Sequence, residues 1–223
     1  MRCQFCERPA WYRCARTGVF VCPQHAKLEV VAPREEARAW SFDVRPATAG
    51  DHPHLRELAL DFWGETEMEC FESSYEVTDL PGFAAFVEDQ LVGFLSYAVE
   101  GDALKIVMLN VLPEHQGQGV AKEFLKAAEA EAQSRGLSRL VVATSNDNLP
   151  GLDFYQRLGF VIEEVLPGRM VEYHGGVEKG FSGIGVRDEI RLQLLLAGSE
   201  GSILSRVLVR SKGRPESADG RAS

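Results

Sequence analysis

Long apolar runs and an excess of basic charge are both missing from this chain. No apolar run is long enough to span a bilayer, and residues 1–13 lack the apolar core of a signal peptide. We therefore expect no membrane partner and a cytoplasmic location. The 24 basic residues are outnumbered by 33 acidic ones, which gives a net charge of −9. This balance argues against nucleic acid as a partner, because general nucleic-acid binding usually needs a basic face.

Cysteine is scarce in this chain outside the N-terminal segment, and Cys70 is the single cysteine there. The other four cysteines are Cys3, Cys6, Cys14 and Cys22. In a reducing compartment such a cluster indicates metal ligands rather than disulfides. The pairs Cys3-x-x-Cys6 and Cys22-x-x-His25 each let two side chains reach one ion, and four such ligands complete a tetrahedral Zn²⁺ shell. A set of free thiols is the alternative interpretation.

Composition divides the chain into segments of different character. Residues 1–27 hold the cysteine cluster, and residues 28–39 form a charged linker that contains Pro33. Residues 40–197 make up the main domain. Residues 198–223 are a tail rich in Ser, Gly and Arg, which we expect to be partly disordered because it lacks a sustained apolar pattern near its end.

The main domain mixes strand and helix patterns. Alternating or continuous apolar residues predict strands over 41–46, 83–87, 91–99, 104–112, 140–143, 160–166 and 190–196. Helical spacing predicts a helix that Asp51 could cap, a second helix after Gly119 that Gly136 would end, and a short one over 152–158. Hairpins followed by strand–helix–strand indicate an α/β fold with a mixed sheet.

A glycine-bearing loop joins the strand over 104–112 to the following helix. Its residues are Gln116, Gly117, Gln118, Gly119, Val120 and Ala121. The N–H groups at a helix start have no intrahelical acceptor and lie at the positive end of the helix dipole. Small residues let those groups approach a diphosphate closely. By loop chemistry alone, a plain tight turn is an equally good interpretation.

The wider pattern resembles the GNAT superfamily of N-acetyltransferases. Leu109-Asn110-Val111-Leu112-Pro113 followed by 116–121 is similar to motif A, Arg/Gln-x-x-Gly-x-Gly/Ala, which Gln116, Gly119 and Ala121 match. About thirty residues later, Asn148 and the run Phe154-Tyr155-Gln156-Arg157-Leu158-Gly159-Phe160 resemble motif B. The resemblance covers residues 41–196 and implies a mostly antiparallel mixed sheet flanked by helices.

The resemblance also implies a cofactor site. The pyrophosphate of acetyl-CoA would lie on residues 116–121, and the pantetheine arm would pair with the backbone of Leu109 and Val111. Asn148 corresponds to a residue that contacts the cofactor near its pantetheine. Tyr155 corresponds to the residue often proposed to protonate the departing thiolate, and a phenol can donate in this way.

Each role has a structural alternative. Tyr155 could be a core aromatic beside Phe154, and Asn148 could cap a helix. No general base is identified. Glutamates at 65, 67, 69 and 72 lie where the family often places acceptor-facing residues, but a run of carboxylates is more often a solvated face. A glycine-rich segment over 173–185 predicts a mobile loop between the last two strands that could set acceptor specificity, or a plain long connection.

The N-terminal spacing resembles half of a B-box-type cross-brace zinc finger. That resemblance pairs Cys3 and Cys6 with Cys22 and His25 on one structural Zn²⁺. Cys14 would belong to a second site, which is lost because its partner position is Thr17. A finger of this kind can bind a protein partner, help to dock the acceptor or only stabilise the N-terminus.

The leading hypothesis is transfer of an acetyl group from acetyl-CoA to a primary amine on a small molecule or a peptide. The alternative is a CoA-binding zinc-finger module that acts as a sensor without turnover. Transfer of a different acyl group is also open, because the loop reads the CoA and not the acyl chain. The identity of the acceptor and the oligomeric state are beyond the sequence.

Overall fold

The computed structural model describes residues 2–6, 8, 10, 12–13, 19–22, 25 and 41–196. The predicted linker 28–39, the tail 198–223 and the positions Cys14 and Thr17 lie outside the described residues. Among the residues that are described, no helix combines the length and apolar character needed to cross a membrane.

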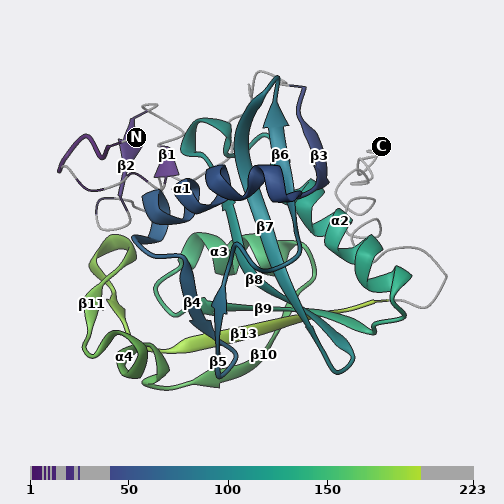
Figure 1. Ribbon diagram of the computed structural model, residues 1–223. Helices are drawn as coiled ribbons and strands as arrows, with labels where there is room; N and C mark the ends of the chain where they lie inside the picture. Colours follow the sequence, from purple (N-terminus) through teal and green to yellow (C-terminus); the bar gives the residue numbers. More distant parts are fainter. Residues whose placement is uncertain are drawn as a thin grey trace, which may run out of the picture.

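A seven-stranded sheet forms the centre of the main domain, in the order β10-β13-β9-β8-β7-β6-β3 (Figure 1). The strands are β3 (Asp43–Pro46), β6 (Gly82–Val87), β7 (Gln90–Glu100), β8 (Ala103–Val111), β9 (Arg139–Ser145), β10 (Val161–Leu166) and β13 (Glu189–Leu195). Neighbouring strands pair antiparallel except β8 and β9, which are parallel. The predicted mixed, mostly antiparallel α/β sheet is therefore confirmed.

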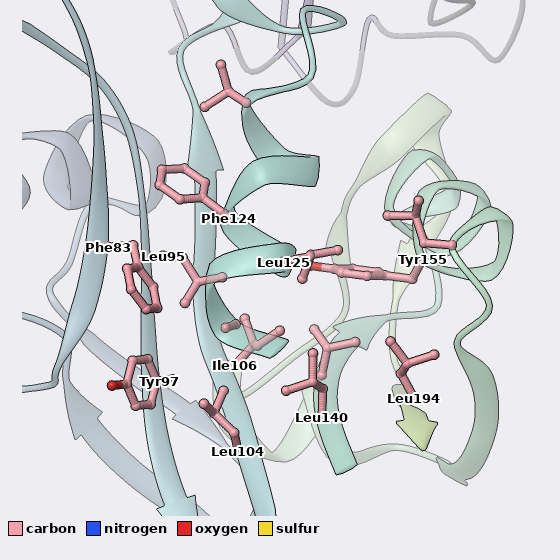
Figure 2. Close-up of a cluster of buried hydrophobic side chains, with 14 of the residues drawn as sticks. Phe83, Leu95, Tyr97, Leu104, Ile106, Phe124, Leu125, Leu140, Tyr155 and Leu194 are labelled. Carbon is pink, nitrogen blue, oxygen red and sulfur yellow. The ribbon is translucent and has the colours of Figure 1, made fainter. Parts of the chain in front are cut away.

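Helices cover both faces of this sheet. They are α1 (His52–Trp63), α2 (Val120–Ser134), α3 (Leu149–Arg157) and the short α4 (Arg169–His174). Short 3₁₀ turns are η3 (Ala49–Asp51), η4 (Pro113–His115) and η5 (Phe181–Gly183). Apolar residues of α1 pack on one face of the sheet, and those of α2 and α3 pack on the other. Figure 2 shows the second of these cores, with Phe124 and Leu125 of α2 directed at the strands.

Small hairpins complete the described part. They are β1 (Tyr12–Arg13) with β2 (Phe20–Val21), β4 (Glu67–Cys70) with β5 (Ser73–Glu76), and β11 (Glu178–Lys179) with β12 (Gly185–Val186). The segment 173–185, which the sequence predicted as a mobile loop, therefore contains the end of α4, a hairpin and η5. Neither the β4–β5 hairpin nor α4 was predicted.

Asp51 differs from its predicted role. It stands at the N-cap position of α1, but its carboxylate makes no capping hydrogen bond to that helix. The carboxylate instead accepts two hydrogen bonds from Arg45, each at 2.8 Å, and one from the Thr48 backbone N–H at 2.7 Å. The guanidinium of Arg45 is a stronger hydrogen-bond partner for this carboxylate than the backbone N–H groups at the helix start, because it carries the opposite charge.

Candidate active site

The two central strands separate at their carboxyl ends and form a wedge. Parallel pairing runs from Ala103 and Arg139 to Ile106 and Val142 and ends there, although β8 and β9 both continue. On its other side, β8 stays paired with β7 as far as Val111. One edge of residues 107–111 is therefore turned toward the opening between the strands.

The backbone groups of Leu109 and Val111 face this wedge. The N–H of Leu112 donates to the Val92 oxygen of β7 at 2.8 Å. Peptide groups of successive strand residues point to alternate sides, so Leu109 and Val111 direct theirs away from β7. In agreement, the side-chain Nε2 of Gln116 donates to the Val111 oxygen at 3.1 Å. This bond brings the glycine loop against the wedge.

Residues 116–121 form an open turn that leads into α2. Gly117 and Gly119 have φ of 76° and 96°, a region that favours glycine, and a Cβ at either position would meet nothing within 4 Å. Gly119 is the N-cap, so the first N–H groups of α2 follow it directly. The side chain of Gln118 donates to the Glu114 oxygen at 3.0 Å and fixes the turn. The turn therefore offers positive backbone dipoles to open space.

Asn148 joins the far side of the wedge to α3. Its Oδ1 accepts the Gly151 N–H at 3.1 Å, and its Nδ2 donates to Thr144 Oγ1 in β9 at 2.8 Å. The helix-cap interpretation of Asn148 is thus confirmed. The same two bonds hold its amide beside the part of β9 that no longer pairs with β8.

Tyr155 lies in the core between α3 and α2. The residue is 7% exposed, and its ring meets Phe160 at a centroid distance of 5.4 Å. In Figure 2 the hydroxyl points from α3 toward Leu125 on α2. Burial raises the pKa of Tyr155 well above its usual range. The group is therefore a phenol that keeps its proton at neutral pH.

The four glutamates of the acidic run differ in their surroundings, and only one of them forms an ion pair described below. The glutamates at 65, 67 and 69 are exposed, as the solvated-face interpretation expects. Glu72 accepts hydrogen bonds from Arg191 at 2.5 Å and from Arg169 at 3.5 Å. The bond from Arg191 is the main cause that lowers the pKa of Glu72. Glu72 is therefore an ion-pair partner, and the general base stays unassigned.

Sequence reasoning missed a buried charged pair beside Glu72. Glu189 is 1% exposed, and its Oε1 accepts from Arg191 Nε at 2.6 Å. Arg191 also binds Glu164 of β10. The signal was the alternation of charged and apolar residues along β13, which puts both charges on the face covered by the β4–β5 hairpin.

The four predicted metal ligands come together. Their ligand atoms all lie within 4.8 Å of one another. His25 Nδ1 lies 3.4, 3.5 and 3.3 Å from the sulfurs of Cys3, Cys6 and Cys22, and the sulfurs of Cys6 and Cys22 are 3.7 Å apart. Tetrahedral Zn²⁺ would require about 3.8 Å between sulfurs and about 3.6 Å between sulfur and nitrogen. The donor set fits that ion.

Comparison with known proteins supplies independent evidence. The model of the acetyltransferase (GNAT) family matches residues 51–160. The uncharacterised protein YdhI of Bacillus subtilis is 30% identical over 141 residues, which are 61% of this chain and 87% of YdhI. YxbD of the same organism is 32% identical over 104 residues, which are 46% of this chain. That match spans 64% of YxbD, a little under two thirds of its length.

Solved structures share the fold. A GNAT family acetyltransferase from Elizabethkingia anophelis, determined with acetyl-CoA bound, superposes with a TM-score of 0.55. The match covers 70% of this chain and 98% of that one at 20% identity. At this identity the likeness is one of fold.

Proposed function

Because this chain belongs to the GNAT family of acetyltransferases, we infer that it transfers an acetyl group from acetyl-CoA to an amine. The observation that carries the inference is the wedge between β8 and β9, which opens beside the glycine turn at the start of α2. An extended arm with a diphosphate at one end has the shape that these two features would bind together.

The cofactor site that we propose has three parts. Residues 116–121 would hold the pyrophosphate through backbone N–H groups, since a Cβ at Gly117 or Gly119 would enter open space in front of the turn. Leu109 and Val111 would pair with the pantetheine arm. Gln116 already binds the Val111 oxygen, so the Val111 N–H and both polar groups of Leu109 would make this pairing. Asn148 would contact the arm from the opposite side.

The chemistry that we propose is direct attack. The neutral amine nitrogen forms a bond to the thioester carbonyl carbon, and the carbon–sulfur bond breaks as the oxyanion collapses. Backbone N–H groups stabilise the oxyanion. Tyr155 gives its proton to the departing thiolate, the attacking nitrogen loses its extra proton to water, and the Tyr155 oxygen then takes up a proton again.

The test is release of free CoA thiol by the full-length protein. Acetyl-CoA would be supplied with spermidine, glucosamine, tyramine or a peptide with a free N-terminus. Amine-dependent thiol release is the expected result, with the acetylated product identified by mass spectrometry. Tight acetyl-CoA binding without thiol release across a broad panel would favour the alternative of a sensor without turnover.

We also propose that Cys3, Cys6, Cys22 and His25 bind one structural Zn²⁺, as in half of a B-box-like cross-brace. The near-tetrahedral spacing of the ligand atoms supports this proposal. Four protein ligands would close the coordination shell and leave no position for chemistry. Thiolates kept as zinc ligands fit a reducing compartment, which supports the predicted cytoplasmic location.

A further inference from the structure

The N-terminal module, defined as the described residues up to His25, packs directly on the main domain. Cys3, Val21 and Cys22 form a buried cluster with Phe181 of η5. Phe181 is 0% exposed, and Tyr12 of β1 meets its ring edge-on at a centroid distance of 5.6 Å. Figure 1 shows β1, β2 and β11 on the same side of the molecule. Two proposed zinc ligands therefore form part of the wall that encloses Phe181.

Phe181 is fastened from its other side by the main domain. Its N–H donates to Asp147 Oδ2 at 2.8 Å, and Asp147 is itself buried. The backbone of Gly180 comes so close that a Cβ there would lie 1.9 Å from the same oxygen. We call residues 180–188 the docking loop, because the N-terminal module packs on its Phe181. A second side chain binds the other end of this loop. Asn146 Oδ1 accepts the N–H groups of residues 187 and 188 at 2.8 and 3.0 Å.

Both anchors belong to one short segment at the mouth of the wedge. Asn146 and Asp147 lie between Ser145, the last residue of β9, and Asn148, which caps α3. Leu149, the first residue of α3, packs against the same cluster as Phe181. The segment 144–149 thus carries the amide proposed to contact the cofactor on one side and the docking loop with the module on the other.

Building on the function proposed above, we propose that the N-terminal module positions the docking loop for acetyl transfer. Phe181 is the positioning residue that links metal occupancy to the active site. Bound metal would fix the side chains of Cys3 and Cys22 through coordination bonds, and without the ion no bond would hold the four ligands together. The wall around Phe181 then loosens, and water reaches the bond between its N–H and Asp147. A loop displaced by about 1 Å can cost on the order of 100-fold in rate.

A double cycle on the full-length protein tests this link by combining zinc removal with Phe181→Ala. Chelation is expected to lower wild-type kcat/KM about tenfold or more, measured with the best amine of the panel. Phe181→Ala should keep its zinc, show the same reduced kcat/KM and lose no more on chelation. Acetyl-CoA affinity is measured alongside, because β1 contacts η4, the 3₁₀ turn that directly precedes the glycine turn. A smaller loss in affinity than in kcat/KM is expected, and an equal loss in both would overturn the assignment to the docking loop. Phe181→Leu keeps an apolar side chain, so its kcat/KM should lie between those of the wild type and Phe181→Ala.

Hydrogen exchange gives a readout that needs no amine. Zinc removal should speed exchange of the Phe181 amide and of the amides at 187 and 188 in the wild type. Arg8→Ala is the matched control in the module, because that residue is exposed and is not one of the proposed ligands. Val161→Ala, on β10 and 56% exposed, is the control in the main domain. Both should keep the wild-type response to chelation.

The outcomes separate this proposal from the proposed function. A holoprotein that releases no CoA with any amine would sink the proposed function, while the exchange experiment would still measure the link. Unchanged turnover and unchanged exchange after zinc removal would overturn the link and leave acetyl transfer standing. Equal further loss on chelation in Phe181→Ala and wild type would also overturn it.

Discussion

At the scale of single residues, Tyr155 combines a buried ring with a hydroxyl directed at α2. Phe at this position keeps the ring contacts and removes the proton. We expect Tyr155→Phe to lower kcat about 100-fold, the lower end of general acid catalysis, while acetyl-CoA affinity stays within about twofold. Steady-state kinetics and calorimetry would measure the two effects. Wild-type turnover in the variant would reduce Tyr155 to a packing residue.

The raised pKa of Tyr155 has a consequence for pH dependence. Burial disfavours the phenolate, so the acid form persists above the usual value of about 10 for tyrosine. The wild-type kcat should therefore show no loss from Tyr155 as pH rises to about 10. A falling limb between about pH 8 and 10 that disappears in Tyr155→Phe would contradict this expectation.

Gly119 tests the phosphate turn. A carboxylate introduced by Gly119→Glu would enter the open space in front of the turn and repel the diphosphate. We expect acetyl-CoA affinity to fall by about 100-fold or more, since opposed like charges cost several kcal/mol. Gly119→Ala is the control, because it carries the same strain at φ of 96° without the charge. Equal calorimetric affinity in the two variants would remove charge repulsion from the explanation.

At the scale of elements, the docking loop depends on a close backbone approach. Gly180→Ala would press a Cβ on Oδ2 of Asp147, a carboxylate held in place because Oδ2 accepts the Phe181 N–H and Oδ1 accepts the Ser145 hydroxyl. We expect a loss of about 1–3 kcal/mol in the free energy of unfolding. Gly176→Ala is the matched control in open space and should be neutral or slightly stabilising. Denaturant unfolding would compare them, and equal stability would refute the close approach.

The elements that local pattern decides were predictable from the sequence. Apolar residues at every fourth position, from Val120 to Ala132, predicted α2, and the residues flanking the turn at 88–90 predicted the β6–β7 hairpin; both are confirmed. The helix predicted over 152–158 begins earlier, at Leu149, because Asn148 caps it. The pairing of Asp51 with Arg45 crosses from a helix start to a strand, and no local pattern encodes that contact.

At the scale of the whole molecule, the metal site can be counted. We expect one zinc per chain, retained in Cys14→Ser and lost in Cys22→Ser, because Cys22 lies within the four-ligand cluster. Zinc removal should leave the main unfolding transition of the acetyltransferase domain in place, since that domain has its own core. Elemental analysis and calorimetry would check both points. Zinc loss in Cys14→Ser with retention in Cys22→Ser would show a wrong ligand set.

The candidate site was predictable only in part, because short spacings in the sequence predict local contacts and not long-range ones. Short spacings brought Cys3 near Cys6 and Cys22 near His25, and the motif order put the glycine turn after β8. Contact between the module and Phe181 joins distant parts of the chain, so spacing says nothing about it. The assignments of Tyr155, Asn148 and the phosphate turn to acetyl-CoA stay predictions until they are tested.

The separation of β8 from β9 gives the sheet an edge in its interior. Edge strands pair readily with extended chains, and a pantetheine arm lying there would act as an additional strand that bridges the two halves. A ligand that binds only the folded state stabilises it by about 2.7 kcal/mol at 100 times its Kd. Acetyl-CoA would then stabilise the folded sheet as well as take part in the reaction, and the melting temperature of the protein would rise with the acetyl-CoA concentration.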